Sequence, residues 1–192
     1  MKQFLIFTVK TLVLLFLLLV VLDFLYTTVY LQSSNRGKID YVYNSAARDY
    51  DVVILGSSRA NNHFVAPMFE AKGLKTFNYG MSGAHLFETS LLLKLMIENG
   101  WKIKNDIVET DLNLSNEKRD DGTFGRFMPF MHKSKTITEH FKNEADFTEL
   151  YYVPFYRYIQ FDAKVGFRAW YKTLVNEPTN TLANNGYYPL GF

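Results

Sequence analysis

The sequence contains no cysteine, and this absence excludes disulfide bonds, thiol catalysis, zinc sites built on thiolates and a lipid anchor attached to cysteine. Net charge is also scarce, at a formal +2 over 192 residues, and the basic residues form no stripe that would follow a phosphate backbone. We therefore expect no nucleic acid partner. The histidines show no His-x-x-x-His spacing, so we expect no metal site and no cofactor.

A nucleotide-binding site and a calcium-binding loop are also disfavoured, because the chain lacks residues that their motifs require. The stretch GSSRANN, from Gly56 to Asn62, has neither the lysine of a P-loop nor the glycine pattern of a dinucleotide-binding turn. The segment from Arg119 to Arg126 lacks the full ligand repeat and the closing glutamate of a calcium loop. We interpret that segment as a solvated loop, and nucleotide binding as a poor hypothesis.

The N-terminus carries a long apolar run, from Phe4 to Leu31, interrupted by Lys10 and Asp23. A bilayer core requires about 20 helical residues, so either Phe4–Leu22 or Thr11–Leu31 is long enough to span it. One central aspartate costs roughly 3 kcal/mol on an insertion scale, and the many leucine, valine and phenylalanine residues of the run outweigh it. The run therefore predicts a transmembrane helix.

We interpret residues 1–31 as an anchor that stays attached, and the alternative is a signal peptide that is removed. A signal peptide usually has a shorter apolar region and ends in small residues, for which only Ser33 and Ser34 are weak candidates. The positive charges of Lys2 and Lys10 favour a cytoplasmic N-terminus. We therefore expect a single-pass protein of the cell membrane, with the rest of the chain on the extracytoplasmic, periplasmic side.

The rest of the chain alternates between strand and helix patterns. After a linker and a short helix over residues 32–50, we expect one α/β domain over residues 51–192. The apolar run DVVILG is typical of a strand buried on both faces of a parallel sheet. Strands are predicted over 51–56, 74–80 and 106–112, with helices over 60–73 and 84–99 between them. This alternation predicts a doubly wound parallel sheet.

Beyond residue 113 the periodic pattern weakens. Residues 116–125 are charged and loop-like, and a helix is predicted over 136–143. The segment 151–175 is rich in aromatic residues and is predicted to be helical. We expect this aromatic segment to pack over the edge of the sheet, and we favour that interpretation over a ligand groove.

Small and polar residues follow each predicted strand, at the edge where parallel sheets bind ligands. Ser58 follows the first strand, and its N–H lies at a predicted helix start, where negative charge is favoured. Gly83 follows the second strand and has no side chain to block the approach of its N–H. Asn113 follows the third strand and offers a side-chain amide. We predict that Ser58 is a nucleophile, that Gly83 and Asn113 donate to an oxyanion, and that the neighbouring Ser57 caps the helix.

The motifs at these strand ends, ILGSSRA, NYGMSG and ETDLN, resemble the first three sequence blocks of the SGNH hydrolases, the GDSL-like esterase superfamily. The resemblance covers roughly a third of the chain and implies a flavodoxin-like three-layer α/β/α fold with serine esterase or acyl-transfer chemistry. It assigns Ser58 as the nucleophile and Gly83 and Asn113 as oxyanion donors. With its anchor, the chain looks most like membrane-anchored bacterial members, some of which act on acylated envelope polymers.

The chain also departs from the family pattern. Ser57 stands where an aspartate is frequent, and the third block lacks its glycine and its final aspartate. The fourth motif, Asp-x-x-His, occurs nowhere in the chain. The family places that pair near its C-terminus, so we expect either a domain that is C-terminally incomplete or a degenerate member. His63, about one turn past Ser58, and His85, just after Gly83, are alternative bases.

Two functions follow from this pattern. The first is a membrane-anchored serine esterase or O-acyltransferase acting on acylated cell-envelope glycans or lipids, with the lipid bilayer and the acylated substrate as its partners. The alternative is a non-catalytic envelope protein that keeps the fold for binding or assembly. The sequence identifies no protein partner in the envelope for either function.

Overall fold

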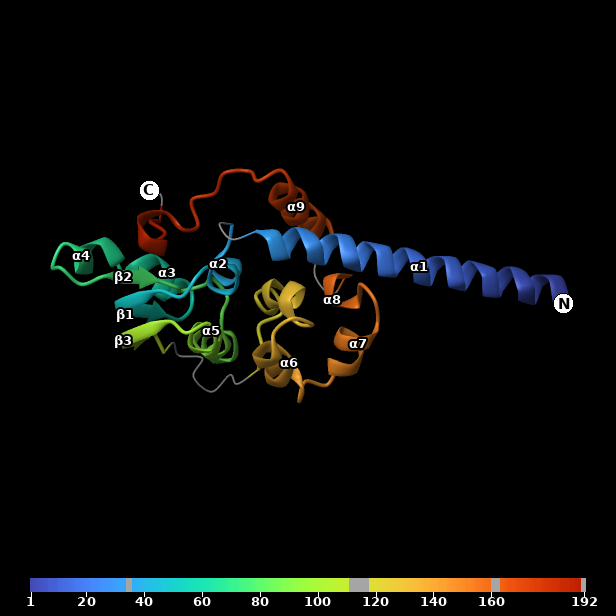
Figure 1. The fold of residues 1–192 in the computed structure, drawn as a ribbon, viewed down its shortest axis with the longest axis horizontal. Coiled ribbons are helices and arrows are strands. Elements are labelled where there is room, and N and C mark those ends of the chain that lie inside the picture. Colours follow the sequence, from blue (N-terminus) through green and yellow to red (C-terminus); the bar gives the residue numbers. More distant parts are fainter. Residues whose placement is uncertain (34–35, 111–117, 160–162, 191–192) are drawn as a thin grey trace.

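The computed structural model describes residues 1–33, 36–110, 118–159 and 163–190 (Figure 1). Its first element is helix α1, Lys2–Gln32, whose 31 residues extend over about 46 Å at 1.5 Å per residue. This helix is long and apolar enough to cross a membrane, whose hydrocarbon core is about 30 Å thick. In Figure 1 the N-terminal part of α1 extends beyond all other elements, and none of its side chains before Tyr26 is buried.

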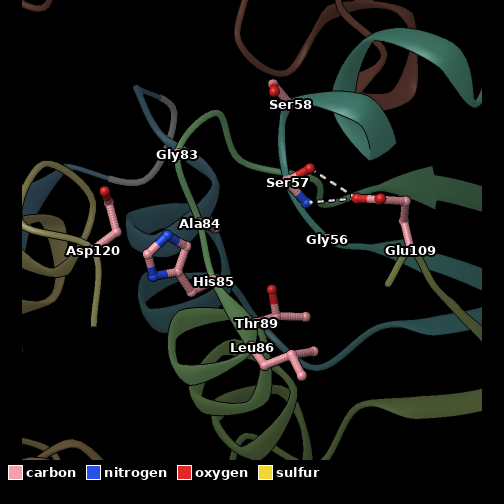
Figure 2. Close-up of a pocket in the computed structure, with 10 residues that line it drawn as sticks. All are labelled: Gly56, Ser57, Ser58, Gly83, Ala84, His85, Leu86, Thr89, Glu109 and Asp120. Carbon is pink, nitrogen blue, oxygen red and sulfur yellow. Dashed lines mark hydrogen bonds between the residues drawn. The ribbon is translucent and has the colours of Figure 1, made fainter. Parts of the chain in front are cut away.

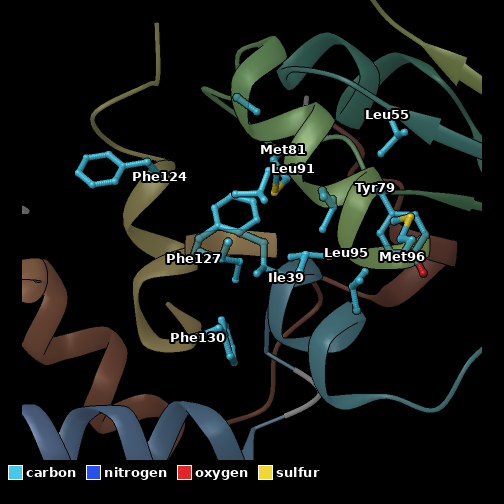
Figure 3. Packing of buried hydrophobic residues seen from close by; sticks show 14 of the residues in the cluster. Ile39, Leu55, Tyr79, Met81, Leu91, Leu95, Met96, Phe124, Phe127 and Phe130 are labelled. Atoms are coloured by element: carbon cyan, nitrogen blue, oxygen red, sulfur yellow. The ribbon is translucent and has the colours of Figure 1, made fainter. Parts of the chain in front are cut away.

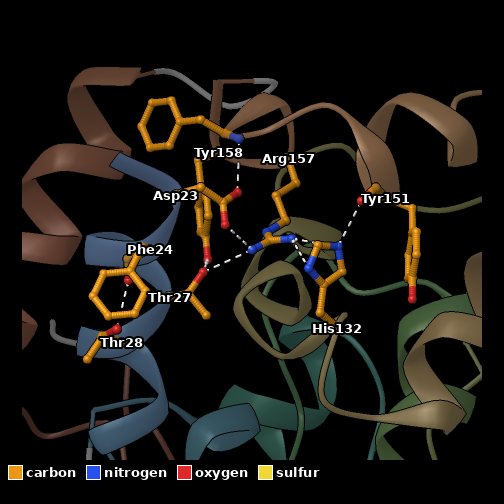
Figure 4. Close-up of polar contacts among 9 residues, drawn as sticks. Asp23, Phe24, Thr27, Thr28, His132, Tyr151, Arg157 and Tyr158 are labelled. Carbon is orange, nitrogen blue, oxygen red and sulfur yellow. Dashed lines mark hydrogen bonds and ion pairs between the residues drawn. The ribbon is translucent and has the colours of Figure 1, made fainter. Parts of the chain in front are cut away.

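The C-terminal third of α1 belongs to the folded body, because a buried arginine binds it (Figure 4). Arg157 Nη2 donates to Asp23 Oδ1 at 2.6 Å and to Thr27 Oγ1 at 2.9 Å, and the Arg157 side chain is only 2 % exposed. The other Asp23 oxygen accepts the backbone N–H of Phe155 at 2.9 Å. Asp23 is thus paired within the protein. Of the two predicted spans, Phe4–Leu22 keeps Asp23 outside the bilayer, whereas Thr11–Leu31 would include it.

The aromatic segment packs on α1 and not, as predicted, over the edge of the sheet. Tyr26 stacks on Trp170 with ring centroids 5.2 Å apart, and it meets Phe155 edge-on at 4.9 Å. The segment forms three helices in place of the predicted one: α7, Phe147–Tyr152, α8, Tyr156–Ile159, and α9, Ala163–Leu174. The break between α7 and α8 has a local cause, because Pro154 disfavours helical geometry at the residue before it and Phe155 has φ 65°.

In the described part of the chain, three strands form a parallel sheet, which confirms the predicted α/β class. They are β1, Asp49–Leu55, β2, Thr76–Asn78, and β3, Lys102–Val108, in the order β2-β1-β3. Val53 of the central strand pairs with Phe77 on one side and with Asp106 on the other. Because the three strands run parallel, their carboxyl ends lie at one edge of the sheet, where the candidate site was expected.

Strand β3 lies earlier in the sequence than predicted. We expected a strand over residues 106–112, whereas the pairing with β1 begins at Lys102 and ends at Val108. Most side chains of β3 are exposed, because it is an edge strand of the described sheet, and this exposure tolerates its lysine, asparagine and aspartate residues. The strand therefore ends just before Glu109, which lies at the carboxyl edge. Residues 111–112 of the predicted strand lie outside the described residues.

Helices pack on both faces of the sheet. Two short helices follow β1: α3, Ser58–His63, and α4, Ala66–Glu70. They cover one face, where Val52 and Ile54 lie in a small buried cluster. We expected a single helix over 60–73, but the chain leaves helical geometry at Phe64 and resumes it where Pro67 lies in the first turn of α4.

The larger core lies on the opposite face (Figure 3). It is built by α2, Lys38–Asn44, α5, Leu86–Glu98, the 3-10 helix η1, Phe124–Phe130, and α6, Lys135–Phe141. Helices α5 and α6 match the predicted helices over 84–99 and 136–143 closely. The helical spacing of Leu91, Leu92 and Leu95 turns these side chains into the core, where all are fully buried.

A buried lysine of α2 joins three segments that are distant in the sequence. Lys38 Nζ donates to Asn61 Oδ1 at 2.7 Å, to the Gly80 carbonyl at 2.6 Å and to the Gly186 carbonyl at 2.8 Å. Gly186 ends the short 3-10 helix η2, Ala183–Gly186. Burial, aided by the charge of Arg126, lowers the pKa of Lys38 to about 7. All three ammonium donors are satisfied by neutral oxygens, so no carboxylate shares this position.

We predict that Arg157→Met lowers the free energy of unfolding by about 3 kcal/mol, because it leaves Asp23 without its charged partner. The matched control is Lys104→Met, which removes the exposed Lys104–Asp51 ion pair and should change the free energy of unfolding far less, because water screens exposed pairs. Denaturant unfolding of the full chain in detergent measures both. Equal losses in the two variants would contradict a buried pair at Asp23.

We also predict a pH dependence that comes from Lys38. Its pKa is about 7 in the folded protein and 10.5 ordinarily, so between these values the unfolded chain binds more protons. The free energy of unfolding therefore rises with pH above about 7, by up to about 1.4 kcal/mol per unit, and below pH 7 the contribution is constant.

Unfolding of the wild type and of Lys38→Met at several pH values from 7 to 9 measures this contribution as the difference between the two proteins. Burial raises the pKa of Asp40 only to about 6, so this carboxyl group does not change its charge in that window. A difference that stays flat from pH 7 to 9 would contradict the lowered pKa of Lys38.

Candidate functional site

A cavity of about 230 Å³ opens at the carboxyl edge of the sheet, between the turn after β1 and the loop that leads into α5 (Figure 2). Its lining comes from four segments that are distant in the sequence: Gly56, Ser57, Ser58, Gly83, Ala84, His85, Leu86, Thr89, Glu109 and Asp120. The structure thus brings Ser58 and Gly83, two of the three predicted site residues, to one cavity.

Ser57 serves as the cap of α3, as predicted. Its Oγ accepts the backbone N–H of Arg59 at 3.2 Å and donates to Glu109 Oε2 at 2.8 Å. Glu109 Oε2 also accepts the Ser57 N–H at 3.2 Å. Gly56 is required beside this pair, because its φ is 139° and a Cβ there would lie 2.8 Å from Glu109 Cβ. The Ser57 hydroxyl is therefore fully engaged in local structure.

Sequence reasoning missed Glu109, because the predicted third strand extended through it. The signal that could have found it is an acidic residue directly after the apolar pair Ile107-Val108, at the strand end that faces the other two loops. Its carboxylate now holds the turn between β1 and α3 in place.

The Ser58 hydroxyl, in contrast, is left open. Ser58 is the first residue of α3, and its Oγ forms no hydrogen bond to any described residue. In Figure 2 its side chain lies at the rim of the cavity and points away from the pair formed by Ser57 and Glu109. A hydroxyl without a hydrogen bond at the start of a helix lies next to backbone N–H groups, and these groups favour negative charge.

Two backbone N–H groups at this cavity are also open. Within the described part of the chain, neither the Ser58 N–H nor the Gly83 N–H has an acceptor. Gly83 has φ 87°, and a Cβ there would lie 2.9 Å from Thr123 Oγ1 and 3.0 Å from Asp120 Oδ1. Glycine is therefore needed both for the backbone conformation and for the close approach of the loop at Asp120.

Asn113, the third predicted site residue, lies outside the described residues. Its assignment as an oxyanion donor stays a prediction from the sequence.

Of the two alternative bases, the structure places His85 at the cavity. His85 Nδ1 lies 2.8 Å from the Lys118 carbonyl, so it carries the proton that this oxygen accepts, and Nε2 of the neutral ring is the basic nitrogen. His63 is exposed at the end of α3 and is not part of the lining. His85 therefore lines the cavity in the tautomer whose Nε2 can accept a proton.

A buried glutamate fixes the segment that carries His85. Glu88 is fully buried, and its carboxylate accepts the backbone N–H of His85 at 2.9 Å and that of Asp120 at 2.8 Å. Burial raises the pKa of Glu88, and these two hydrogen bonds oppose that change. Helix α5 and the loop at Asp120 are thus joined at one side of the cavity.

Asn78 fixes the loop before Gly83 by side-chain hydrogen bonds. Its Nδ2 donates to the carbonyl groups of Ala60 at 2.6 Å and Phe64 at 2.8 Å, and its Oδ1 accepts the Gly80 N–H at 2.8 Å. A Cβ at Gly80 would lie 2.4 Å from the backbone nitrogen of Asn61, so α3 and this loop touch directly. The segments of Ser58 and Gly83 are therefore held against each other.

The charges at the cavity are mostly negative. Glu109 and Asp120 contribute carboxylates, and His85 is the basic side chain in the lining. Within the described residues, no group of three histidine, aspartate or glutamate side chains is arranged to hold a metal ion. The lining therefore favours a neutral ligand that binds through hydrogen bonds to the open N–H groups.

Comparison with protein-family models, with curated proteins and with solved structures finds no match for this chain. The similarity to SGNH hydrolases therefore rests on the three sequence motifs alone.

The two neighbouring serines give a matched pair of stability predictions. Ser57→Ala removes a helix cap and the partner of Glu109, so we expect the free energy of unfolding to fall by about 1 kcal/mol or more. Ser58→Ala removes no hydrogen bond to a described residue, so we expect a change within about 0.5 kcal/mol. Thermal or denaturant unfolding of both variants measures the difference, and a larger loss for Ser58→Ala would show that its hydroxyl is structural.

Proposed function

We propose that the protein is a membrane-anchored serine esterase or O-acyltransferase that acts on acylated glycans or lipids of the cell envelope. The observation that carries the proposal is the coincidence of three open groups at one cavity: the Ser58 hydroxyl and the backbone N–H groups of Ser58 and Gly83. Acyl transfer requires a hydroxyl that is free to attack and donors that are free to bind an oxyanion.

The chemistry that this arrangement supports has two steps. Ser58 Oγ attacks the ester carbonyl while His85 Nε2 accepts its proton, and the two N–H groups bind the oxyanion of the tetrahedral intermediate. Each such donor contributes about 3 kcal/mol in the transition state. The alcohol leaves with the proton, and water or an acceptor hydroxyl then takes the acyl group from Ser58. Asn113 remains the predicted third donor.

The size and charge of the cavity suggest the kind of acyl group. About 230 Å³ accommodates a short acyl chain, whereas the rest of a polymer substrate remains outside. The carboxylates of Glu109 and Asp120 repel an anionic group. We therefore infer a small neutral ester, such as an acetyl ester on a sugar, as the substrate class.

Helix α1 supports the proposed anchor and the proposed location. Lys2 and Lys10 favour an N-terminus in the cytoplasm, which places the α/β body on the extracytoplasmic side. Removal of α1 as a signal peptide would take Asp23 away from the buried Arg157 and Tyr26 away from its ring partners. This cost supports an uncleaved anchor with Phe4–Leu22 in the bilayer.

The proposed fold is a flavodoxin-like three-layer arrangement of the SGNH type. Its support is the order β2-β1-β3, the parallel pairing and the packing of helices on both faces of the sheet. The predicted site residues then lie at the carboxyl edge, as that fold type requires.

The experiment that tests this function is hydrolysis of an acetyl ester reporter by the full chain in detergent. We expect Ser58→Ala to abolish turnover, and His85→Gln to lower the maximal rate by about 100-fold or more, because proton transfer contributes that much. His63→Gln is the matched control and should retain most of the activity, because His63 is exposed outside the cavity lining.

Mass spectrometry after reaction with a serine-reactive phosphonate provides a second readout, with the adduct expected on Ser58. Turnover that survives Ser58→Ala, or an adduct on another serine, would overturn the assignment. A protein that neither hydrolyses esters nor reacts with the phosphonate would support the non-catalytic envelope protein instead.

A further inference from the structure

A second and larger cavity of about 820 Å³ lies between the C-terminal third of α1, α2, η1 and α9. It is separate from the site of Ser58, although the loop after β2 borders both cavities: Gly80 and Ser82 line the larger one and Gly83 the smaller one. Nothing in the proposed ester chemistry uses this space.

The wall formed by α1 and α9 combines large rings with small residues. Tyr26 and Tyr30 of α1 line the cavity from one side, and Gly166 and Ala169 of α9 line it from another. The small side chains of α9 leave the space open, whereas the tyrosines offer extended apolar surfaces. Such a wall suits an acyl chain.

Positive charge borders the same cavity. Arg126 lines it and forms no hydrogen bond or ion pair with a described residue, although the carboxylate of Asp120 attracts its charge. Lys38 also lines it, and the three hydrogen-bond partners of its side chain are neutral oxygens. Asp40 and Asp121 line the cavity as well, but one Asp40 oxygen already accepts from Ser33 Oγ and from the Arg36 N–H. The guanidinium of Arg126 is therefore available to an anion, and its planar donors match a phosphate group.

Helix α9 links this cavity to the membrane surface. Trp170 Nε1 donates to the Leu25 carbonyl at 3.4 Å, so α9 crosses α1 about one turn beyond Leu22, where the proposed span ends. The outer face of α9 is apolar: Phe167, Tyr171 and Leu174 follow helical spacing and are 56 %, 52 % and 52 % exposed. An exposed apolar stripe on a helix beside a membrane anchor is typical of a helix that lies in the bilayer interface.

We propose that this second cavity binds one anionic phospholipid taken from the bilayer, with the phosphate on Arg126 and an acyl chain between α1 and α9. The inference uses the proposed anchor but not the proposed ester chemistry. The large apolar wall favours a lipid, because free phosphate has no apolar part that could cover it. The guanidinium of Arg126 favours a phospholipid, because a neutral lipid has no anionic group to bind it.

Native mass spectrometry of the full chain in a neutral detergent tests the proposal, with dioleoyl phosphatidylglycerol, dioleoyl glycerol and inorganic phosphate as separate probes. We expect one phosphatidylglycerol to bind, and the two other probes to bind at least about tenfold more weakly. Arg126→Gln should weaken phosphatidylglycerol binding by about tenfold, because a charge-assisted contact is lost. Arg48→Gln, at an exposed arginine outside the cavity lining, is the matched control and should bind normally.

Gly166→Leu is a second variant that fills the cavity from the side of α9. A Cβ at this position would lie 3.8 Å from the Tyr158 carbonyl oxygen, an ordinary contact, so the helix can accept it. We expect phosphatidylglycerol binding to be lost while ester turnover, if present, continues. Equal binding of dioleoyl glycerol, or unchanged phosphatidylglycerol binding in both variants, would overturn the proposal, whichever way the ester assay turns out.

Discussion

The position of the candidate site depends on one buried ammonium group. Lys38 binds Asn61 three residues after Ser58 and the carbonyl of Gly80 three residues before Gly83, so both segments are attached to one point. Its third partner, Gly186, brings the C-terminal part of the described chain to the same place. A buried charge is costly unless all its donors are used, and here each one has an oxygen within 2.8 Å. The relative position of the segments that carry Ser58 and Gly83 therefore depends on the hydrogen bonds of Lys38 in α2, and not on the two loops alone.

A second ionic contact fixes the body to its long helix. Arg157 and Asp23 form an ion pair between α1 and α8 (Figure 4). Beside it, Tyr26 packs against the rings of Phe155 and Trp170. The helix α1 is thus part of the folded structure and not a tether. This attachment places the body directly beside the C-terminal end of the apolar run in α1.

Sequence reasoning predicted the elements whose pattern is set locally. The first two strands and the helices at α5 and α6 have buried faces with clear periodicity, as Leu91, Leu92 and Leu95 illustrate. Strand β3 was misplaced because an edge strand carries polar residues, and only its pairing with β1 fixes its limits. The aromatic segment was misplaced because its partner, Tyr26, is more than a hundred residues away and lies in the segment that we interpreted as the anchor.

The sequence predicted where the residues of the candidate site lie, but it did not predict the hydrogen bonds that hold them. Glycine and serine at strand ends indicated the position of Ser58 and Gly83, since parallel strands present their carboxyl ends together. The contacts that distinguish Ser57 from Ser58 depend on Glu109, and those that place His85 depend on Glu88 and Lys118, none of which has a motif. Such contacts arise from long-range packing, so neighbouring residues in the sequence carry no sign of them.

The proposed chemistry requires the hydroxyl of Ser58 and two backbone N–H groups to meet at one carbonyl. A crystal structure of the phosphonate adduct would show whether they do. We expect phosphorus bonded to Ser58 Oγ and a phosphoryl oxygen within about 3 Å of both the Ser58 and Gly83 nitrogens. A phosphoryl oxygen directed to solvent, with both N–H groups left unpaired, would contradict it.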